Sequence, residues 1–299
     1  MDINDRFLAI VIAAGLSSRM GGFKPLMDVG GKPVLLRLLD TIYSAGIGRA
    51  VVVTGYGRKD IEAALAGHRG GDQSRMNVVT IFNSDYESGM FGSIQTGIRC
   101  AVGHQAVSAA LLFPVDVPLV SDKTITGLIR AWDHETPGDN FELSNVSDPT
   151  AALGVWEQGA LDGGSELPGI GAQANTPRAR EQGAHDSKPE LPAFNGRGSV
   201  SRVWKQRAPD GRPAPPFAVP VYQGRNGHPL LIPREYFGEI LNYKGEGGLK
   251  GVRAGYDESM IRYETDDRGC VLDMDTAEDY RQVLEHLDSE KYGKREWRK

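Results

Sequence analysis

A short segment after the first apolar run combines the residue types that bind phosphate. Residues 13–24 read Ala-Ala-Gly-Leu-Ser-Ser-Arg-Met-Gly-Gly-Phe-Lys. The glycines let the backbone approach an anion closely, and successive backbone N–H groups can surround phosphate oxygens. Arg19 and Lys24 add two cations, and an arginine can bind phosphate oxygens through two parallel hydrogen bonds. The segment is therefore a candidate binding loop for a triphosphate.

Three better-known loops do not fit this segment. A dinucleotide-binding loop needs the spacing GxGxxG, which the segment lacks. A P-loop needs Ser or Thr after Gly-Lys, whereas Gly31-Lys32 is followed by Pro33. A nucleophile elbow needs GxSxG, whereas Gly15-Leu16-Ser17-Ser18 is followed by Arg19. Composition alone leaves triphosphate binding and an ordinary strand-end loop open as alternatives.

Strands alternate with helices through the first half of the chain, and the candidate loop follows the first strand. Residues 7–13 are continuously apolar, which is typical of a strand buried on both faces. Further strands are expected at 49–54, 77–82 and 109–113, with helices at 34–45, 59–66, 89–101 and 121–132. This alternation predicts an α/β fold with a mostly parallel twisted sheet and helices on both faces. Such sheets bind ligands beyond the carboxyl ends of their strands.

The pattern stops between residues 137 and 216. These 80 residues hold 10 of the 17 prolines, and 12 of them are Ile, Leu, Val or Phe. So little apolar surface does not form a core, which predicts a low-complexity, disordered insert in a surface loop. A regulatory or partner-binding insert is the alternative.

Regular structure is expected again after the insert. The patterns predict strands at 217–222, 229–232, 260–263 and 271–272, and helices at 234–242 and 276–287. Residues 1–136 and 217–290 would then form one discontinuous domain. The last nine residues, 291–299, carry five cations and are expected to be a frayed basic tail.

Composition argues against several classes of protein. The 299 residues carry a formal net charge of -5, which gives no general attraction to nucleic acid or to an anionic membrane. Cys100 and Cys270 lack the CxxC spacing of a zinc ribbon and are too few for a disulfide scaffold. No apolar run reaches the roughly 18 residues of a membrane span. We expect a soluble, cytoplasmic protein with no nucleic-acid or membrane partner.

Five motifs, in order along the chain, resemble the MobA-like nucleotidyltransferases, and most closely the molybdenum cofactor cytidylyltransferases. The loop AAGLSSRMG with Lys24 is similar to the signature loop of that family. Residues 89–97 (GMFGSIQTG) resemble its nucleotide-contacting helix start, and residues 114–118 (PVDVP) resemble its metal-binding motif. Residues 227–229 (GHP) and 272–279 (LDMDTAED) resemble its GHP element and its DxDTPED ending. The insert at 137–216 is left unmatched.

The resemblance implies a nucleotidyltransferase with a Rossmann-like fold. In the family's reaction an acceptor phosphate attacks the α-phosphorus of a nucleoside triphosphate and pyrophosphate leaves, so that catalysis is positioning and charge stabilisation. Catalytic roles are implied for Arg19, Lys24 and Asp116. Ser93, at a helix start that favours anions, is either a nucleotide contact or an ordinary helix serine. The implied nucleotide-binding residues are Ala13, Ala14, Gly15, Ser17, Ser18, Arg19, Lys24 and Ser93.

Magnesium is the cofactor that the resemblance implies. Proteins hold Mg²⁺ through one or two carboxylates together with substrate phosphate. Asp116, otherwise a turn residue, is the first expected ligand. Asp273 is the second, because Asp275 stands three residues before Glu278 in a spacing typical of a helix cap. Which of Asp273 and Asp275 binds the metal stays open.

The implied acceptor is the molybdopterin cofactor, with His228 and Asp275 as acceptor-binding residues. His228 has a second interpretation as a residue that orders its loop. Residues 245–251 (GEGGLKG) depart from the family's Gly-Asp-x-Gly-Ala-Arg-like stretch, in the region of acceptor recognition, and Ala277 replaces the usual proline. A sugar phosphate or an alcohol phosphate therefore stays open as the acceptor.

Ala14 bears on the choice of nucleotide. Cytidylyl-transferring members carry Ala-Ala-Gly at this loop, whereas guanylyl-transferring relatives tend to have glycine at the second position, and a Cβ there crowds a purine. We therefore expect transfer of CMP from CTP to a phosphorylated acceptor, with GTP as the alternative. A hypothesis of another class is a chaperone that binds molybdenum cofactor and delivers it to a molybdoenzyme client; the altered residues 245–251 and the insert favour it.

Overall fold

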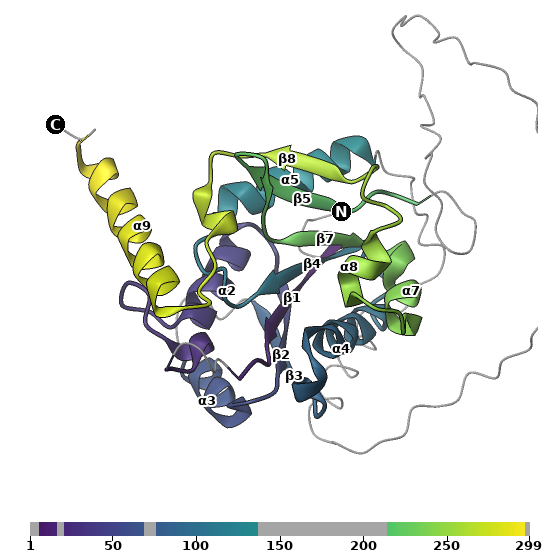
Figure 1. Cartoon of the computed structure of the whole chain (residues 1–299), viewed down its shortest axis with the longest axis horizontal. Helices are drawn as coiled ribbons and strands as arrows, with labels where there is room; N and C mark the ends of the chain where they lie inside the picture. Colours follow the sequence, from purple (N-terminus) through teal and green to yellow (C-terminus); the bar gives the residue numbers. More distant parts are fainter. Residues whose placement is uncertain (1–5, 17–20, 69–75, 137–213, 297–299) are drawn as a thin grey trace, which may run out of the picture.

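One eight-stranded sheet forms the centre of the protein (Figure 1). The computed structural model describes residues 6–16, 21–68, 76–136 and 214–296, with side chains up to residue 289. The strand order is β3-β2-β1-β4-β7-β5-β6, and β8 pairs with β5. The strands are β1 (Phe7–Ala13), β2 (Arg49–Thr54), β3 (Asn77–Phe82), β4 (Ala109–Pro114), β5 (Ala218–Tyr222), β6 (Arg225–Asn226), β7 (Leu230–Pro233) and β8 (Ile261–Glu264).

The sheet is mixed but mostly parallel, which confirms the predicted fold class. Strands β1 to β4 pair in parallel, as do β5 and β8. Strand β7 is antiparallel to both β4 and β5, so that β5 runs in the same direction as β1 to β4. The carboxyl ends of six strands therefore meet at one edge, and β7 begins at that edge.

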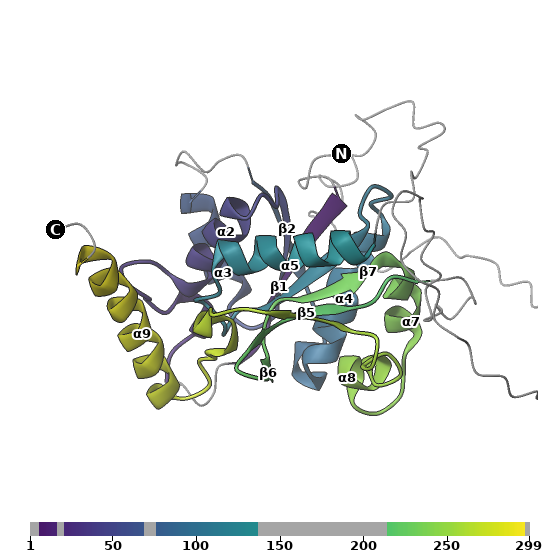
Figure 2. The same cartoon turned by 90° about the horizontal axis from the view of Figure 1, so that it is seen from above.

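Helices cover both faces of the sheet (Figure 2). One face carries α2 (Val34–Ser44), α3 (Arg58–His68) and α5 (Asp122–Glu135). Helix α9 (Ala277–Glu296) stands beside the sheet, and its Val283 and Leu287 join the core on this side (Figures 1 and 2). The other face carries α4 (Met90–Val102), α7 (Phe237–Asn242) and α8 (Gly248–Arg253). Four short 3-10 helices complete the fold: η1 (Lys24–Leu26), η2 (Tyr86–Ser88), η3 (Arg234–Tyr236) and η4 (Arg268–Val271).

Strand β1 is the centre of both hydrophobic cores. All seven of its residues are buried, as a strand covered on two faces requires. Its side chains alternate between the core under α2 and α5 and the core under α4. A Cβ added to Gly97 of α4 would lie 2.4 Å from Ile10 Cγ2, so that only glycine lets α4 pack this closely on β1.

The second half of the chain departs from the sequence prediction in three places. The strand expected at 271–272 is wrong, because η4 occupies 268–271 and its turn is held by the Asp267 carboxylate, which accepts a hydrogen bond from the Gly269 N–H at 2.8 Å. Helix α8 was not predicted from the sequence. Helix α9 continues to residue 296, so that residues 291–296 are helical rather than a frayed tail.

The predicted insert lies mainly outside the described residues, which resume at residue 214. Its last residues pack into the fold, since Ala214 is fully buried. The indole N–H of Trp132 on α5 donates a hydrogen bond to the Pro216 carbonyl at 2.9 Å. In the described ranges, no helix is both long enough and apolar enough to cross a bilayer.

Candidate active site

The candidate site lies at the carboxyl ends of β1 and β4, which are neighbours in the sheet. Ile12 pairs with Pro114, so the chain leaves both strands side by side. A pocket of about 240 Å³ opens between the two exits. Five of the predicted site residues line it: Ala14, Gly15, Lys24, Ser93 and Asp116.

Four other predicted nucleotide contacts are placed differently. Ser17, Ser18 and Arg19 lie outside the described residues. Ala13 is the last residue of β1, and its side chain is fully buried in the core under α2 and α5. Ala13 therefore supports the pocket from below, while Ala14 and Gly15 form its wall.

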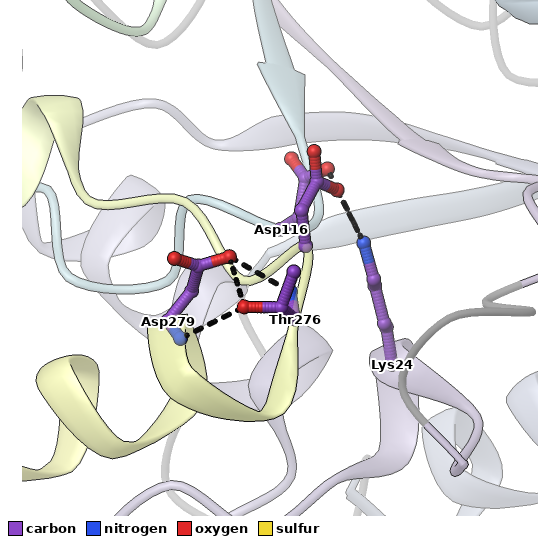
Figure 3. Close-up of polar contacts among 5 residues, drawn as sticks. Lys24, Asp116, Thr276 and Asp279 are labelled. Carbon is purple, nitrogen blue, oxygen red and sulfur yellow. Dashed lines mark hydrogen bonds and ion pairs between the residues drawn. The ribbon is translucent and has the colours of Figure 1, made fainter.

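The ammonium group of Lys24 meets two carboxylates that come from distant parts of the chain, and Figure 3 shows Lys24 pointing toward Asp116. Its ammonium nitrogen is 2.7 Å from Asp275 Oδ1 and 3.9 Å from Asp116 Oδ2. The lysine side chain is 13% exposed, so this charge is partly withdrawn from water. The contact with Asp275 joins positions 251 residues apart and brings the motif near the C-terminus to the first loop.

Asp116 is held in an environment that disfavours its charged form. Burial raises the pKa of its carboxyl group, and the neighbouring Asp275 and Asp273 raise it further. Lys24 opposes this effect. An accumulation of negative charge beside one lysine fits a site that receives an additional cation together with its substrate.

The motif at residues 272–279 caps α9 differently from the sequence prediction. The Asp279 carboxylate accepts hydrogen bonds from the Thr276 N–H and hydroxyl group, both at 2.8 Å, and Thr276 Oγ1 accepts one from the Asp279 N–H at 3.2 Å (Figure 3). This is a reciprocal capping pair. The predicted cap at Asp275 and Glu278 is wrong by one position, because the Asp275 carboxylate binds Lys24 instead.

Asp273 lies close enough to the site to act on it electrostatically but also faces other groups. Partial desolvation raises the pKa of its carboxyl group, followed by the effects of Asp275 and Asp279, while Arg225 and Lys24 lower it. Asp273 lines a second cavity together with Arg225. Asp275 therefore contacts Lys24 directly, whereas Asp273 lines the second cavity and acts on Lys24 only electrostatically.

Asp116 together with either Asp273 or Asp275 fits a divalent cation whose remaining ligands are substrate oxygens. Asp273 and Asp275 both affect the pKa of Asp116, so the three carboxylates share one electrostatic environment. Among the described residues, no three His, Cys, Asp or Glu side chains are grouped closely enough to hold a metal by themselves. Magnesium commonly binds proteins through one or two carboxylates and takes substrate phosphate for the rest.

Ser93 is oriented by Asn83, a residue that the sequence analysis did not single out. Ser93 is 1% exposed and lies in the first turn of α4. The Asp85 N–H donates to Asn83 Oδ1 at 3.1 Å, which leaves the Asn83 NH₂ group to donate to Ser93 Oγ at 3.0 Å. The Ser93 hydroxyl accepts this bond and keeps its own proton to donate elsewhere. Since Ser93 lines the pocket, a ligand oxygen there is a suitable acceptor.

His228 stands just before β7, at the same edge of the sheet. Leu230 pairs with Leu112, which places His228 at the level of Pro114. Its backbone N–H donates to the Cys270 carbonyl at 2.8 Å, while Nδ1 is buried with no hydrogen-bond partner among the described residues. Burial, followed by the charge of Arg253, lowers the pKa of the imidazole to about 4. His228 is therefore neutral at pH 7.

Residues 245–251 pack beside the helix that carries Ser93. Gly247 and Gly248 have positive φ angles of 80° and 54° and lead into α8. A Cβ at Gly248 would lie 3.1 Å from Phe91 in the first turn of α4. The Phe91 ring meets Tyr243 edge to face with centroids 6.0 Å apart. This stretch is thus an ordered wall near the pocket.

The first half of the chain is similar to a known family of transferases. Residues 9–153 match the family of the MobA-like NTP transferase domain. The bifunctional protein GlmU of Sorangium cellulosum is 32% identical over 147 residues, which is 48% of this chain and 30% of GlmU. The chain therefore spans less than a third of the length of that curated relative.

Several solved structures have a similar fold. Rv0371c from Mycobacterium tuberculosis aligns with a TM-score of 0.56 at 19% identity, over 94% of this chain and 97% of that protein. A complex of Rv0371c with manganese aligns with a TM-score of 0.52 at 18% identity, over 94% and 98%. A nucleotidyl transferase from Methanothermobacter thermautotroptrophicus has a TM-score of 0.56 at 16% identity, over 94% and 97%. At these identities the likeness concerns the fold.

Proposed function

We propose that this protein moves CMP from CTP to a phosphorylated acceptor, the molybdopterin cofactor. The match of residues 9–153 to the MobA-like NTP transferase domain supports nucleotidyl transfer. One observation carries the proposal: Lys24 lies between Asp116 and Asp275 at a pocket that Ala14, Gly15 and Ser93 also line. This places a cation, a buried acid and a hydroxyl donor around a space for phosphate. The proposal extends to the acceptor, which the pocket alone does not identify.

The reaction requires one bond to form and one to break at the α-phosphorus. An oxygen of the acceptor phosphate attacks, and the bond from the α-phosphorus to the bridging oxygen breaks, so that pyrophosphate leaves with the bonding electrons. Lys24 is placed to stabilise negative charge on these phosphate oxygens, and the Ser93 hydroxyl to donate a hydrogen bond to one of them. The glycine-containing loop supplies backbone N–H groups for the remaining oxygens.

Asp116 is the residue that we assign to a divalent cation, with Asp273 or Asp275 as a second ligand. When bound, Mg²⁺ would neutralise phosphate oxygens and fix their orientation. The raised pKa of Asp116 supports this role, because a nearby cation would stabilise its charged form. The manganese complex of Rv0371c, a protein of the same fold, is a further reason to test both metals.

Ala14 supports CTP as the nucleotide. Its side chain lines the pocket and is 3% exposed, so its methyl group takes up space that a larger base would need. Its carbonyl accepts a hydrogen bond from the Tyr56 N–H at 3.3 Å, which fixes the loop at this point. The motif resemblance supports molybdopterin as the acceptor, and His228 and Asp275 are the residues that we assign to acceptor contact.

The test is release of pyrophosphate from each of the four nucleoside triphosphates with Mg²⁺ or Mn²⁺. Molybdopterin, a sugar 1-phosphate and an alcohol phosphate serve as acceptors. We expect CTP with molybdopterin to give the highest kcat/KM. Faster reaction with GTP would overturn the nucleotide assignment, and turnover with a sugar phosphate instead would overturn the acceptor assignment. Absence of pyrophosphate with every pair, together with delivery of molybdopterin to a molybdoenzyme, would favour the chaperone hypothesis.

A further inference from the structure

A second cavity lies along the same edge of the sheet, beyond Asp273. It has a volume of about 560 Å³, within the range of small-molecule sites. We call it the arginine cavity, because Arg225 at the start of β6 and Arg268 at the start of η4 both line it. Gln223, Gln282, Asp273 and Asp279 contribute further polar groups.

Arg225 acts electrostatically on Asp273, which lines the same cavity, but neither arginine has a direct polar partner in the described part of the chain. Both residues are exposed, and neither guanidinium forms a hydrogen bond or an ion pair with another described residue. Of the two acids in the wall, Asp279 is committed to the cap of α9 through its bonds to Thr276. Unpaired guanidinium groups in a concave site bind carboxylate or phosphate in a bidentate manner.

The β5–β6 hairpin brings Arg225 to the cavity at a cost in backbone energy. Tyr222 pairs with Arg225, so Gln223 and Gly224 form a two-residue turn. Both have positive φ, 48° for Gln223 and 78° for Gly224. Glycine or asparagine is preferred at the first of these positions, so a glutamine there is strained. The Gln223 side chain lines the cavity, which gives a reason for its presence at this position.

Asp273 lines the arginine cavity and lies within electrostatic range of the nucleotide pocket. It interacts electrostatically with Asp116 and Lys24 in the pocket. Strand β5 runs parallel to β4, and its end, Tyr222, lines the cavity at the edge where the chain leaves β4 for Asp116. One elongated molecule can therefore occupy both spaces.

We propose that the arginine cavity binds the acceptor by an anionic group remote from its reacting phosphate, through Arg225 and Arg268. This inference rests on the proposed function and specifies the acceptor: it is a phosphate ester with a second anionic group. The two glutamine amides offer donors and acceptors for further polar groups of the acceptor. A phosphate ester without a second anionic group would leave both arginines without a ligand.

The kinetic test compares Arg225→Gln and Arg268→Gln with Arg130→Gln, an exposed arginine on α5 outside both cavities. Each cavity variant is expected to raise the KM for molybdopterin about tenfold and to leave the KM for CTP unchanged. Arg130→Gln should change neither. An unchanged KM for molybdopterin, or an equal rise in the KM for CTP, would overturn the proposal. Because both arginines are exposed and unpaired, their replacement should leave the melting temperature as it is.

A binding test separates this proposal from the proposed function. Calorimetric titration with inorganic phosphate needs no turnover; the wild type and Lys24→Met should bind it, while the Arg225→Gln/Arg268→Gln double variant should bind about tenfold more weakly or not at all. If the wild type turns over no acceptor while the three proteins still bind phosphate as expected, the proposed function is wrong. The assignment of the arginine cavity as an anion site is then retained. Loss of binding in Lys24→Met with retention in the double variant would overturn the cavity assignment.

Gln223→Gly should make the protein more stable and its binding of the acceptor weaker. Glycine relieves the positive φ of residue 223 and should raise the melting temperature. Loss of the amide should raise the KM for molybdopterin about threefold, the value of one neutral hydrogen bond. A gain in stability with unchanged KM would show that Gln223 has no part in acceptor binding.

Discussion

The nucleotide pocket and the arginine cavity lie along one edge of the same sheet but are built in different ways. The nucleotide pocket is formed by side chains that are shielded from solvent. Ser93 is 1% exposed, and burial raises the pKa of Asp116. The arginine cavity depends on exposed side chains from the β5–β6 turn and η4. Packing therefore preorganises the first site, whereas the second is formed by groups that can change without disturbing a core. Substitution of Ser93 or Asn83 should consequently affect stability and activity together, whereas substitution of either cavity arginine should affect affinity alone.

The largest effect is expected from Asp116→Asn. Removal of the carboxylate should lower turnover by about 10²- to 10³-fold, as loss of a group that stabilises transition-state charge does. The melting temperature should stay the same or rise, because burial disfavours the charged form of Asp116. Pyrophosphate release and thermal unfolding measure the two quantities, with Asp60→Asn on α3 as the exposed control. Retention of full turnover would remove Asp116 from the mechanism.

Lys24→Met and Asp275→Asn should move the pH dependence of activity in opposite directions. Lys24 lowers the pKa of Asp116 and Asp275 raises it. The acid limb of kcat/KM should therefore shift to higher pH in Lys24→Met and to lower pH in Asp275→Asn. Loss of the lysine should also reduce kcat/KM for CTP by about 10- to 100-fold at neutral pH. A shift in the same direction in both variants would contradict the electrostatic account of the site.

Asn83→Ala tests whether the buried hydrogen bond from Asn83 to Ser93 contributes to nucleotide binding. Without its amide donor the Ser93 hydroxyl is free to rotate, and the KM for CTP should rise about fivefold, the equivalent of one hydrogen bond. Ser93→Ala should have a similar effect, and the double variant should be no worse than Ser93→Ala alone. Additive effects in this cycle would mean that Asn83 acts independently of Ser93. Urea unfolding gives the accompanying loss of stability.

His228→Gln should have the smallest effect on folding stability, and this effect should appear only in acid. The pKa of His228 is about 4 in the folded state, below the ordinary value of 6.5, so the unfolded chain takes up the proton first. Folding stability should therefore fall as the pH drops from about 6.5 to about 4, and the substitution should remove this part of the decline. Urea unfolding at pH 7 and pH 5 measures the difference. Equal pH dependence in both proteins would contradict the buried, neutral state of His228.

The strands of the first half were predictable because their sequence carries the physical signal by itself. Residues 7–13, 49–54 and 77–82 are apolar runs between polar turns, and the structure has β1, β2 and β3 at these bounds. The strand expected at residues 271–272 was inferred from two apolar residues alone. Two residues are too few to distinguish a strand from a 3-10 helix, which the Asp267 side chain stabilises here. Helix α8 has only six residues, two of which are glycines, and a third glycine, Gly247, precedes it. Its sequence therefore resembles a loop.

The candidate site was predictable where a motif is local and unpredictable where the contact is distant. Gly15, Lys24 and Asp116 were identified from short motifs, and the structure brings them to one pocket. The contact of Lys24 with Asp275 depends on which residue caps α9, and two neighbouring spacings in the sequence fit a cap equally well. Asn83 follows β3 as an ordinary turn residue would, and nothing in the sequence indicates its bond to Ser93.

The arginine cavity had no counterpart in the sequence analysis. Arg225 and Arg268 are 43 positions apart and belong to no shared motif. Their proximity arises because β5 brings the β6 turn and η4 together through tertiary contacts. An arginine indicates an anion site only when the structure shows that no described acid binds its guanidinium group directly, and the sequence does not contain this information.

Trp132 and Pro216 hold together the two places where residues 137–213 leave and rejoin the described fold. Their hydrogen bond fixes the start of β5 against α5, whatever the length of polypeptide between them. Closing a longer loop adds only about 0.6 kcal/mol for each doubling of its length. This junction is therefore a natural point for evolutionary insertion and deletion, and a fluorescent reporter could be grafted there without altering strand order.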